Sequence, residues 1–555
     1  MSESMQTQKN LPNPFRNATL AGALSAASQK WPDSAAYVIG DERLTFREAA
    51  ESMSRVARGF MAAGIKKGDR VAIWMAGYRE WLESFLGLAA IGAIAVPVST
   101  RFSVPELAHA LARAEARGIV YHTEVVGSKD YESRLVEALS DRSRSAAGKP
   151  LGDSLNLRIS VGKSELPNAI TFAEMIERGA AISDDAYAAA LASVTSEDPL
   201  ILLFTSGTTS LPKAAVSLHG GQLGGSAAFF ERLNLRHGDR FFCPQPFFHG
   251  GGVLGLYSPI VSGATVVFQT YYDVDAALEV MVREKCNVTM GHQPHYIEYF
   301  SRPDYQRAFA AVDRAWVIAP KHIMKLVHEK TGIASVFSPY GATEANGTSC
   351  AFDDPMEARL NTVGSALPGV TVGILDASGD GKITHAYPTG EGEVCLKSPY
   401  MMRGYWNDPE ATAAVIDKDG WYHTGDLGRV DEHGRLHLLG RVRETIRVGG
   451  ENVTSAEIEA ALLHCKGVKQ SVAVGAPDER LGEIIVAFVE AQEGVKLDAE
   501  SLREELKPKL ARFKIPHCLV FQKEWPMTGS GKIARKELEA AAAVVAAERQ
   551  SAVTS

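Results

Sequence analysis

The sequence predicts an α/β fold: a large N-terminal domain of doubly wound sheets with a small antiparallel β unit, followed by a small α+β C-terminal domain. Three observations predict it. The chain has 555 residues, more than a single hydrophobic core usually supports, so at least two domains are expected. Short apolar runs alternate with amphipathic stretches over the first three-fifths of the chain. After about residue 360 the runs are joined by tight turns instead.

The apolar runs of the first part indicate buried parallel strands. They contain little polar alternation and are bounded by Gly, Pro or Asp, as expected for strands that are covered on both faces. The eight runs are RVAIWMAG, AIAVPVS, RGIVYH, LILLFTSG, ATVVFQ, NVTMGH, AWVIAP and SVFSPYG. Amphipathic stretches such as SVPELAHALARAEARG separate them. Strands that alternate with helices predict a doubly wound α/β body.

The later part of the chain has two patterns. VTVGILDASGDG, GEVCLKS and GRVDEHGRLHLLGR are short runs with turn residues between them, which is typical of strands joined in hairpins. Beyond Arg441, helical and strand-like segments alternate over about a hundred residues, the size of a compact domain. We therefore predict domains at 1–440 and 441–555, with the boundary near 440–443.

Composition and charge narrow the class of protein. Hydrophobic residues make up 45% of the chain and charged residues 22%, which is ordinary for a globular enzyme. The net charge of −8 argues against general nucleic-acid binding. We expect no transmembrane segment, and the first residues lack the basic-then-apolar pattern of a secretory signal. The six cysteines are scattered singly, which fits neither a disulfide framework nor a zinc site. We therefore expect a cytoplasmic protein.

The strongest local signal is LILLFTSGTTSLPKAAV. A buried strand ends in a run of hydroxyl residues around a glycine, which can present both hydroxyls and backbone N–H groups to an anion. Lys213 adds a positive charge close by. The hydroxyl run consists of Thr205, Ser206, Gly207, Thr208 and Thr209. Such a loop alone is often a plain turn, but a strand, a hydroxyl loop, Pro and Lys in this order are less common.

Two further stretches carry polar groups suited to a nucleotide. In SPYGATEANG, Thr343 offers a hydroxyl beside Glu344, a hard oxygen ligand suited to Mg²⁺. In WYHTGDLGRVDEHGRLHLLGR, Asp426 stands in a turn and Arg441 follows after a hairpin. A carboxylate in such a turn can accept hydrogen bonds from both hydroxyls of a ribose. Taken singly, Asp426 could be a turn-former and Arg441 a solvated charge.

The stretch PMTGSGKIARKEL near the C-terminus is not a phosphate loop of the usual kind. That loop needs G-x-x-x-x-G-K-[ST]. Here Pro526 stands where the first glycine should be and has no N–H, and Ile533 follows Lys532 without a hydroxyl. On its own, the Gly-Ser-Gly turn would be a surface loop.

Together, seven stretches resemble in order and spacing the core motifs of the adenylate-forming superfamily of acyl-CoA synthetases, adenylation domains and beetle luciferases. They are FTSGTTSLPK, YGATE, GYWNDPEAT, YHTGDLG, GRVRETIRVGGENV, APDERLGE and PMTGSGKIARKEL. The resemblance runs from about Thr45 to Leu538. It implies an AMP-forming acyl-CoA synthetase that activates a carboxylic acid with ATP, releases pyrophosphate, and then transfers the acyl group to CoA.

The resemblance also implies roles for single residues. The hydroxyl loop and Lys213 would hold the β- and γ-phosphates, Thr343 the α-phosphate, and Glu344 the Mg²⁺. Tyr340 and Gly341 would lie against the adenine, and Asp426 and Arg441 would hold the ribose. The C-terminal domain would be mobile and pivot at Arg443. Lys532 would be catalytic in adenylation, and the loop of Gly449, Gly450, Glu451 and Asn452 would line the path of CoA.

The chain departs from the family pattern at the expected acyl pocket. Relatives commonly carry Gly-Gly-Ala-Pro there, whereas this chain has Val317-Ile318-Ala319-Pro320 preceded by Trp316. Bulkier side chains would reshape the pocket, and we predict that Trp316 and Ala319 line it. His249, in PQPFFHGGG, matches the stretch that gates the acyl site in relatives. Ser210 and Ala214 replace glycines that are usual in the family, which would stiffen the pyrophosphate loop.

Two other patterns carry no functional assignment. LGGS at 223–226 is similar to a carrier-protein attachment motif, but it lies inside the nucleotide domain, so we interpret it as helix packing. His292 and His295 have the spacing of a helical pair, but the sequence shows no carboxylate or cysteine partner, and we do not predict a metal site there.

Three alternatives to the CoA ligase remain at this stage. A stand-alone adenylation enzyme that loads a carrier protein would share nearly every motif. A luciferase-like oxygenase would use the same adenylate. A nucleotide-binding regulator without catalysis is opposed by the presence of both Glu344 and Lys532. The sequence does not identify the acid, and a homodimer is one possible assembly.

Overall fold

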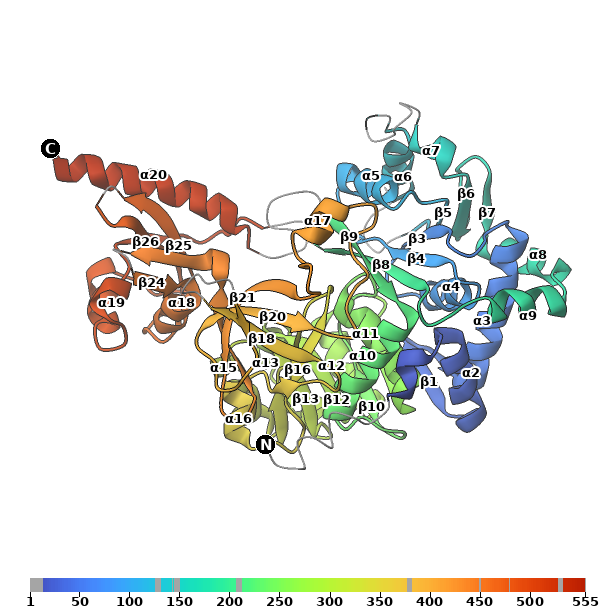
Figure 1. The fold of residues 1–555 in the computed structure, drawn as a ribbon, viewed down its shortest axis with the longest axis horizontal. Helices are drawn as coiled ribbons and strands as arrows, with labels where there is room; N and C mark the ends of the chain where they lie inside the picture. Colours follow the sequence, from blue (N-terminus) through green and yellow to red (C-terminus); the bar gives the residue numbers. More distant parts are fainter. Residues whose placement is uncertain are drawn as a thin grey trace. The chain divides into compact units, whose positions relative to one another are not determined.

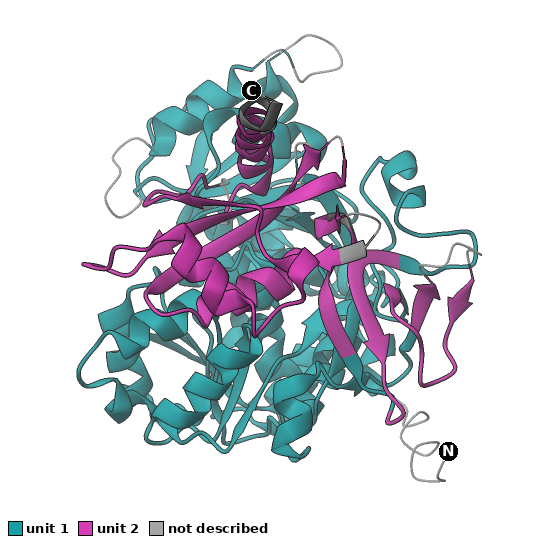
Figure 2. Ribbon diagram, turned by 90° about the vertical axis from the view of Figure 1, so that its left-hand side faces the viewer, with its two compact units in different colours: residues 1–372, 396–422, 434–436 teal, residues 373–395, 423–433, 437–555 magenta. Residues whose placement is uncertain are grey.

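The protein is described by a computed structural model that covers residues 13–124, 131–141, 143, 150–205, 212–376, 382–448, 451–478, 480–527 and 533–554. Within these ranges, the side chains of Arg443, Glu451, Asn452 and residues 550–554 are not described. The chain divides into two compact units, which Figure 2 shows in different colours. The first comprises residues 1–372, 396–422 and 434–436, and the second comprises residues 373–395, 423–433 and 437–555.

This division differs in one respect from the domains expected from the sequence. Residues 373–395 and 423–433 group with the C-terminal residues, whereas the sequence placed all of 1–440 in one domain. A boundary drawn at one point of the sequence cannot express this grouping, because the chain passes between the units several times. The boundary at 441–443 stays a prediction.

The first unit contains two seven-stranded sheets. One has the order β7-β6-β5-β3-β4-β8-β9, and its neighbours are parallel except for β8 and β9. Its strands are β3 (Arg70–Trp74), β4 (Ile94–Pro97), β5 (Gly118–His122), β6 (Leu157–Val161), β7 (Ala169–Thr171), β8 (Pro199–Thr205) and β9 (Lys213–Leu218). The helices between these strands are α4 (Arg79–Ala90), α5 (Val104–Arg113), α6 (Tyr131–Leu139), α7 (Leu151–Ser154), α8 (Phe172–Arg178) and α9 (Asp184–Ala192).

The other sheet has the order β14-β13-β12-β10-β11-β1-β2, and only β1 and β2 are antiparallel. Its strands are β1 (Ala35–Ile39), β2 (Glu42–Thr45), β10 (Arg240–Phe242), β11 (Thr265–Phe268), β12 (Val288–His292), β13 (Arg314–Ile318) and β14 (Ser335–Phe337). The helices in this part of the chain, most of them labelled in Figure 1, are α2 (Leu20–Lys30), α3 (Phe46–Ala62), α10 (His219–Arg232), α11 (Gly250–Ser262), α12 (Val274–Arg283), α13 (Gln293–Phe300), α14 (Tyr305–Phe309) and α15 (Lys321–Thr331).

Smaller elements complete the first unit. A three-stranded sheet has the order β15-β16-β17. These strands and the remaining helices are β15 (Tyr340–Gly341), β16 (Asn346–Ser349), β17 (Ser365–Ala366), α16 (Met356–Asn361), α17 (Pro409–Ala413) and the 3₁₀ turns η1 (Pro14–Asn17) and η2 (Gly179–Ala181).

The strands are buried because both faces of the large sheets are covered. On β13, Trp316 stacks on Phe230 of α10 with ring centroids 5.2 Å apart, while Val317 packs in a core with Tyr296 of α13. Neither Trp316 nor Val317 has exposed surface. All eight apolar runs contain a strand of these sheets. The predicted doubly wound α/β body is therefore confirmed.

The second unit contains two sheets. One has the order β19-β18-β20-β21-β22, and the other has the order β24-β23-β26-β25 with β27 parallel to β26. The strands are β18 (Thr371–Asp376), β19 (Ile383–Thr384), β20 (Gly392–Lys397), β21 (Tyr422–Val430), β22 (Leu436–Arg441), β23 (Thr445–Val448), β24 (Glu451–Thr454), β25 (Val468–Asp478), β26 (Gly482–Ala491) and β27 (Cys518–Phe521). The helices are α18 (Ser455–Leu463), α19 (Ala499–Leu506), α20 (Arg535–Thr554), η3 (Val442–Glu444) and η4 (Arg512–Lys514). Among the described residues, no helix combines the length and the apolar character needed to cross a membrane.

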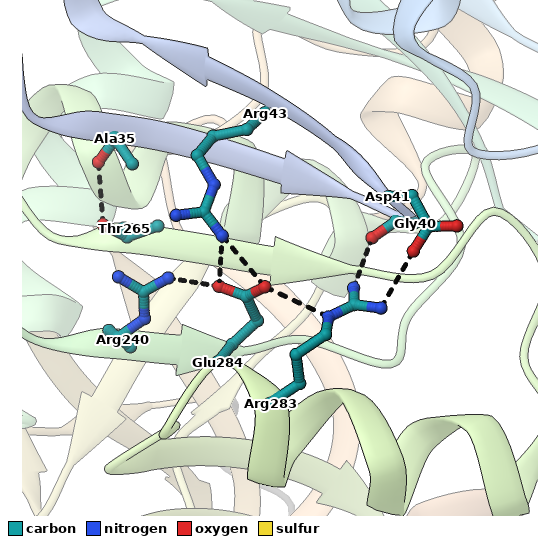
Figure 3. A network of polar contacts seen from close by, with 8 residues as sticks. All are labelled: Ala35, Gly40, Asp41, Arg43, Arg240, Thr265, Arg283 and Glu284. Atoms are coloured by element: carbon teal, nitrogen blue, oxygen red, sulfur yellow. Dashed lines mark hydrogen bonds and ion pairs between the residues drawn. The ribbon is translucent and has the colours of Figure 1, made fainter.

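A cluster of arginines around one carboxylate links the edge strand β2 to the interior strand β10 and to α12 in the second large sheet (Figure 3). Glu284, whose side chain is 5% exposed, accepts hydrogen bonds from Arg43 of β2 at 2.8 and 3.0 Å, from Arg283 at 3.2 Å, and from Arg240 of β10. Burial raises the pKa of Glu284, but the arginines outweigh burial and hold that pKa below its ordinary value. The carboxylate thus stays charged where side chains from β2, β10 and the end of α12 meet.

A more deeply buried ion pair leads to a prediction about stability. Arg314 and Asp239 are joined by two hydrogen bonds of 2.8 and 3.1 Å, and their side chains are 5% and 8% exposed. Arg314→Met would leave the Asp239 carboxylate buried without its main partner, so the free energy of unfolding of the first unit should fall by about 3–5 kcal/mol. Denaturant unfolding followed by tryptophan fluorescence measures this loss.

The matched control is Arg302→Met. Arg302 also binds an aspartate, Asp275, at 2.5 Å, but the two side chains are 36% and 63% exposed. Water screens this pair, so its loss should cost much less. If both variants lost the same free energy of unfolding, burial of the Arg314–Asp239 pair would make no difference to its contribution to stability.

The ion pair of Arg314 and Asp239 also determines how the stability of the fold changes with pH. Burial raises the pKa of Asp239, but hydrogen bonds from Arg314, Asn287 and the Arg236 backbone N–H outweigh burial and lower that pKa. Its contribution to stability is therefore fully present above the ordinary aspartate pKa of about 3.9 and is lost as the pH falls through the lowered value.

Candidate active site

The predicted phosphate loop connects two paired strands of the first large sheet. β8 and β9 are antiparallel, and Thr205 at the end of β8 lies opposite Lys213 at the start of β9. The pairing holds the two ends of the loop side by side at the edge of the sheet. Ser206, Gly207, Thr208 and Thr209, and the family departure Ser210, lie outside the described residues.

A tight turn presents the predicted metal ligand. β15 and β16 are joined by a turn in which the Ala342 and Ala345 backbones exchange hydrogen bonds of 2.8 and 3.2 Å. Thr343 and Glu344 occupy the middle of this turn, and the Glu344 residue is 8% exposed. Tyr340, which is 9% exposed, and Gly341 form β15 just before it.

Tyr405 contacts Glu344, Lys213 and Thr205. It was not identified as a site residue from the sequence. Its hydroxyl donates a 2.8 Å hydrogen bond to the Glu344 carboxylate, and the Lys213 Nζ lies 5.2 Å from its ring centroid. Burial and then the charge of Glu344 raise the pKa of the Tyr405 hydroxyl, while a hydrogen bond with the Thr205 side chain acts in the opposite direction. The hydroxyl therefore stays protonated and acts as a donor to Glu344.

The position of Tyr405 depends on backbone pairing with β9. Arg403 donates to the Val216 carbonyl at 2.9 Å, Gly404 accepts from the Val216 N–H at 2.9 Å, and Trp406 donates to Ala214 at 2.8 Å. The stretch GYWNDPEAT, already noted as a family motif, contains Tyr405 and was the signal that could have found it. Residues Thr205, Lys213, Glu344 and Tyr405 thus form one cluster, which we call the β9 cluster.

The start of α11 lies next to the turn of Glu344. His249 is the N-cap of this helix, and its Nδ1 accepts a hydrogen bond from the Gly251 N–H at 3.2 Å. The position that a Cβ would take at Gly250 is 3.8 Å from the Thr343 Oγ1. The helix N-terminus, which attracts anions through its unpaired N–H groups, therefore lies beside the residue predicted to contact the α-phosphate.

The two predicted acyl-pocket residues lie in different surroundings. Trp316 has no exposed surface and packs between Phe229, Phe230 and Phe241, so it belongs to the aromatic core between β13 and α10. Ala319 is half-buried just beyond the end of β13. Access of an acyl group to Trp316 would require these aromatic rings to move, so the assignment of Trp316 to the pocket stays a prediction.

The pair His292 and His295 forms a helix cap. The His292 N–H donates to His295 Nδ1 at 3.0 Å at the start of α13. The His292 ring also meets the His249 ring, with centroids 6.1 Å apart. Burial, and then the neighbouring His292 and Arg101, lower the pKa of His295 to about 4. His295 is therefore neutral at physiological pH.

In the second unit, the structure brings the two predicted ribose ligands together. Arg441 Nε lies 2.7 Å from the Asp426 carboxylate, and the side chains are 56% and 16% exposed. The prediction that Asp426 stands in a turn is wrong, because Asp426 lies within β21 (Tyr422–Val430). Gly425 before it has a φ of +71°, which suits a glycine, and the Asp426 N–H donates to the Thr424 hydroxyl at 3.0 Å. The pair presents a carboxylate and a guanidinium from two strands of one sheet.

The predicted mobile elements are only partly described. Gly449, Gly450 and Lys532 lie outside the described residues, as do the side chains of Arg443 and Glu451. The backbone of Arg443 lies in η3. The ends of the segment that carries Lys532 are joined, because Met527 pairs with Ile533 and the Ala534 N–H donates to Pro526 at 2.7 Å.

A half-buried ion pair anchors the helix that follows Lys532. At the start of α20, Arg535 binds Glu459 of α18 at 2.6 Å and reaches Glu444 of η3 at 3.5 Å. It also donates to the Ala473 carbonyl at 3.1 Å. Burial raises the pKa of Glu459 in spite of this cation. Within the second unit, Arg535 therefore connects the predicted hinge segment to the end of the segment that carries Lys532.

Comparison with known proteins defines the class. The profile of the AMP-binding enzyme family matches residues 24–406, and that of the AMP-binding enzyme C-terminal domain matches residues 457–532. An acyl-CoA ligase of Aspergillus fumigatus is 31% identical over 528 residues, covering 91% of this chain and 88% of that protein. The mitochondrial medium-chain acyl-CoA ligase of Danio rerio is 29% identical over 95% of this chain and 88% of that protein.

A solved structure shares the fold. The ATP-bound MatB of Rhodopseudomonas palustris superimposes with a TM-score of 0.80 at 24% identity and covers 95% of this chain and 99% of that one. The chain belongs to the AMP-binding enzyme family. Within that family it is an acyl-CoA synthetase, a ligase that joins a carboxylic acid to CoA.

Proposed function

We propose that this acyl-CoA synthetase works in two half-reactions, with adenylation at the β9 cluster. The observation that carries the proposal is the meeting of three groups around Tyr405: Thr205 and Glu344 contact its hydroxyl, and Lys213 lies against its ring. Hydroxyls, a cation and a carboxylate at the end of a strand suit the triphosphate of ATP and its metal ion. Acid-dependent exchange of pyrophosphate into ATP, followed by CoA-dependent release of AMP, tests the proposal.

A magnesium ion fits the residues at this site. Glu344 is a carboxylate with little exposed surface beside the hydroxyls of Thr343 and Tyr405, and Mg²⁺ prefers hard oxygen ligands with one or two carboxylates. When bound, Mg²⁺ would supply charge neutralisation for the phosphates. Tyr405 donates to one oxygen of the Glu344 carboxylate and so limits its orientation, and the other oxygen would be available to the metal.

The other predicted residues have roles in the same scheme. Lys532 offsets the charge that develops at the α-phosphate, and Asp426 with Arg441 holds the ribose. His249, beside the helix N-terminus and Thr343, stands at the entrance for the acid. Gly449, Gly450 and Glu451 line the path for the thiol of CoA. These assignments follow the family resemblance.

The proposed hinge at Arg443 leads to a prediction about the two half-reactions. Arg443→Pro would fix φ near −65° at the proposed pivot, and thioester formation requires the backbone to leave its adenylation conformation at this point. We expect the variant to keep pyrophosphate exchange and to lose thioester formation by about tenfold or more. The two half-reactions are measured separately, by exchange and by CoA-dependent consumption of a synthetic acyl-adenylate.

Arg443→Ala is the matched control, because it removes the guanidinium but leaves φ free. It should retain both half-reactions. If Arg443→Pro loses both equally while remaining folded, the pivot lies elsewhere; if Arg443→Ala shows the same selective loss, the side chain matters and the backbone does not.

The acceptor, the acid and the assembly belong to the same proposal. Because the protein is an acyl-CoA synthetase, we propose that it transfers the acyl group only to free CoA and not also to a carrier protein. Kinetics with CoA and with a phosphopantetheinyl carrier protein test this selectivity. A panel of short, long, aromatic and polycyclic acids identifies the substrate. A cytoplasmic location, a place in fatty acid metabolism and a homodimer are further proposals, and sedimentation tests the last.

A further inference from the structure

Three side chains of different chemistry meet in the five-stranded sheet of the second unit. Glu393 and Cys395 lie two residues apart on β20, and His423 lies on the adjacent strand β21 (Figure 1). The carboxylate, the thiol and the imidazole each place one donor atom within 4.8 Å of the others. We propose that these residues form a binding site for a thiophilic divalent ion of the Zn²⁺ type.

The distances between the donors match those around a tetrahedral zinc ion. With bonds of about 2.3 Å to sulfur and about 2.0–2.1 Å to nitrogen and oxygen, the sulfur and nitrogen should be about 3.6 Å apart and the nitrogen and oxygen about 3.3 Å. The Cys395 Sγ is 3.6 Å from the His423 Nδ1, and that Nδ1 is 3.1 Å from the Glu393 Oε2. Two of the three donor separations thus lie close to those expected around a tetrahedral zinc ion, and the third is below 4.8 Å.

The surroundings orient the carboxylate for this purpose. The second oxygen of Glu393 accepts a 2.9 Å hydrogen bond from the Gly425 N–H, which directs the first oxygen toward His423. A ligand whose other atom is held in this way loses little freedom on binding a metal. The Thr424 hydroxyl also donates to the Val394 carbonyl at 2.8 Å and holds the two strands together beside the cluster.

The burial of the three residues and the chemistry of their donor atoms determine which metal ions the proposed site prefers. Cys395 has no exposed surface, whereas the His423 and Glu393 side chains are 25% and 20% exposed. The site is thus reached from solvent on one side, where water completes a four-coordinate shell. A sulfur ligand favours Zn²⁺ or Co²⁺ over Mg²⁺ and Ca²⁺, which prefer all-oxygen sites. The site is therefore chemically distinct from the proposed Mg²⁺ position at Glu344.

The test uses Co²⁺ as a spectroscopic probe of the full-length chain. Protein treated with a chelator and kept reduced without added thiol is titrated with Co²⁺ alone. The expected result is a thiolate-to-cobalt charge-transfer absorption that saturates at one equivalent and disappears on addition of Zn²⁺. Zn²⁺ should also raise the midpoint of thermal unfolding, because it binds the folded chain.

Two variants and one control identify the ligands. Cys395→Ser should abolish the charge-transfer absorption and the thermal shift, and His423→Gln should weaken Co²⁺ binding. Cys518→Ser removes a half-exposed thiol of the same unit outside the cluster and should leave both signals unchanged. Circular dichroism confirms that the variants are folded. Absence of charge-transfer absorption in the unmodified protein, or its persistence in folded Cys395→Ser, would overturn the proposal.

Discussion

Lys532→Ala is expected to slow acid-dependent ATP–pyrophosphate exchange by about 10²–10³-fold or more, the range seen when a preorganised charge-stabilising donor is removed. The positive charge offsets the repulsion between the incoming carboxylate and the triphosphate. It then offsets the charge that builds on the α-phosphate in the transition state. Neither effect is needed once the adenylate exists, so the loss should be confined to one half-reaction.

Thioester formation provides the contrast. With synthetic acyl-adenylate and CoA supplied, Lys532→Ala should make thioester at close to the unmodified rate. Stopped assays of pyrophosphate exchange and of CoA consumption measure the two half-reactions on one preparation. If both activities fell together in a folded variant, Lys532 would be a structural or shared-site residue.

The surroundings of Lys532 make this experiment interpretable. The chain on both sides of residues 528–532 is held by the pairing of Met527 with Ile533 and by the ion pair of Arg535 with Glu459. Removal of one side chain between them should therefore leave α20 in place. Lys536→Ala is the matched control, because Lys536 is an exposed lysine in the first turn of α20. It should leave both half-reactions unchanged.

Glu344→Gln is expected to lower the rate of adenylation at limiting Mg²⁺ by about 10²-fold, since charge stabilisation by a metal ion is worth several kcal/mol and about 1.4 kcal/mol corresponds to a factor of ten. Glutamine has nearly the shape of glutamate, and its carbonyl oxygen can still accept from Tyr405. The substitution therefore removes the negative charge and leaves the turn intact. The Mg²⁺ dependence of pyrophosphate exchange measures the effect.

Tyr405→Phe separates the charge of Glu344 from its orientation. This variant removes the 2.8 Å hydrogen bond to the carboxylate but keeps the charge, so we expect a smaller loss and a milder shift in the Mg²⁺ requirement. Normal turnover of Glu344→Gln at limiting Mg²⁺ would show that Glu344 is no metal ligand. If Tyr405→Phe lowered the rate of adenylation as much as Glu344→Gln does, the Tyr405 hydroxyl would matter as much as the charge of Glu344.

Several features were accessible from the sequence because they depend on neighbouring residues. The run AWVIAP is short and apolar, which is typical of a strand whose side chains are buried on both faces of a sheet, so β13 (Arg314–Ile318) could be predicted. The family resemblance likewise named Asp426 and Arg441 together as ribose ligands, and the two side chains lie 2.7 Å apart.

The sequence by itself thus determined the strands, the α/β class and the family, whereas the tertiary structure decided which side chains face each other. In AWVIAP both Trp316 and Val317 are apolar, so alternation could not show that Trp316 faces α10. Tyr405 reaches Glu344 only because its segment pairs with β9. Cys395 and His423 stand 3.6 Å apart although 28 residues separate them, and scattered cysteines had argued against a zinc site. The side-chain periodicity of a strand or helix follows from the local backbone conformation, but contacts such as these depend on how distant strands pair.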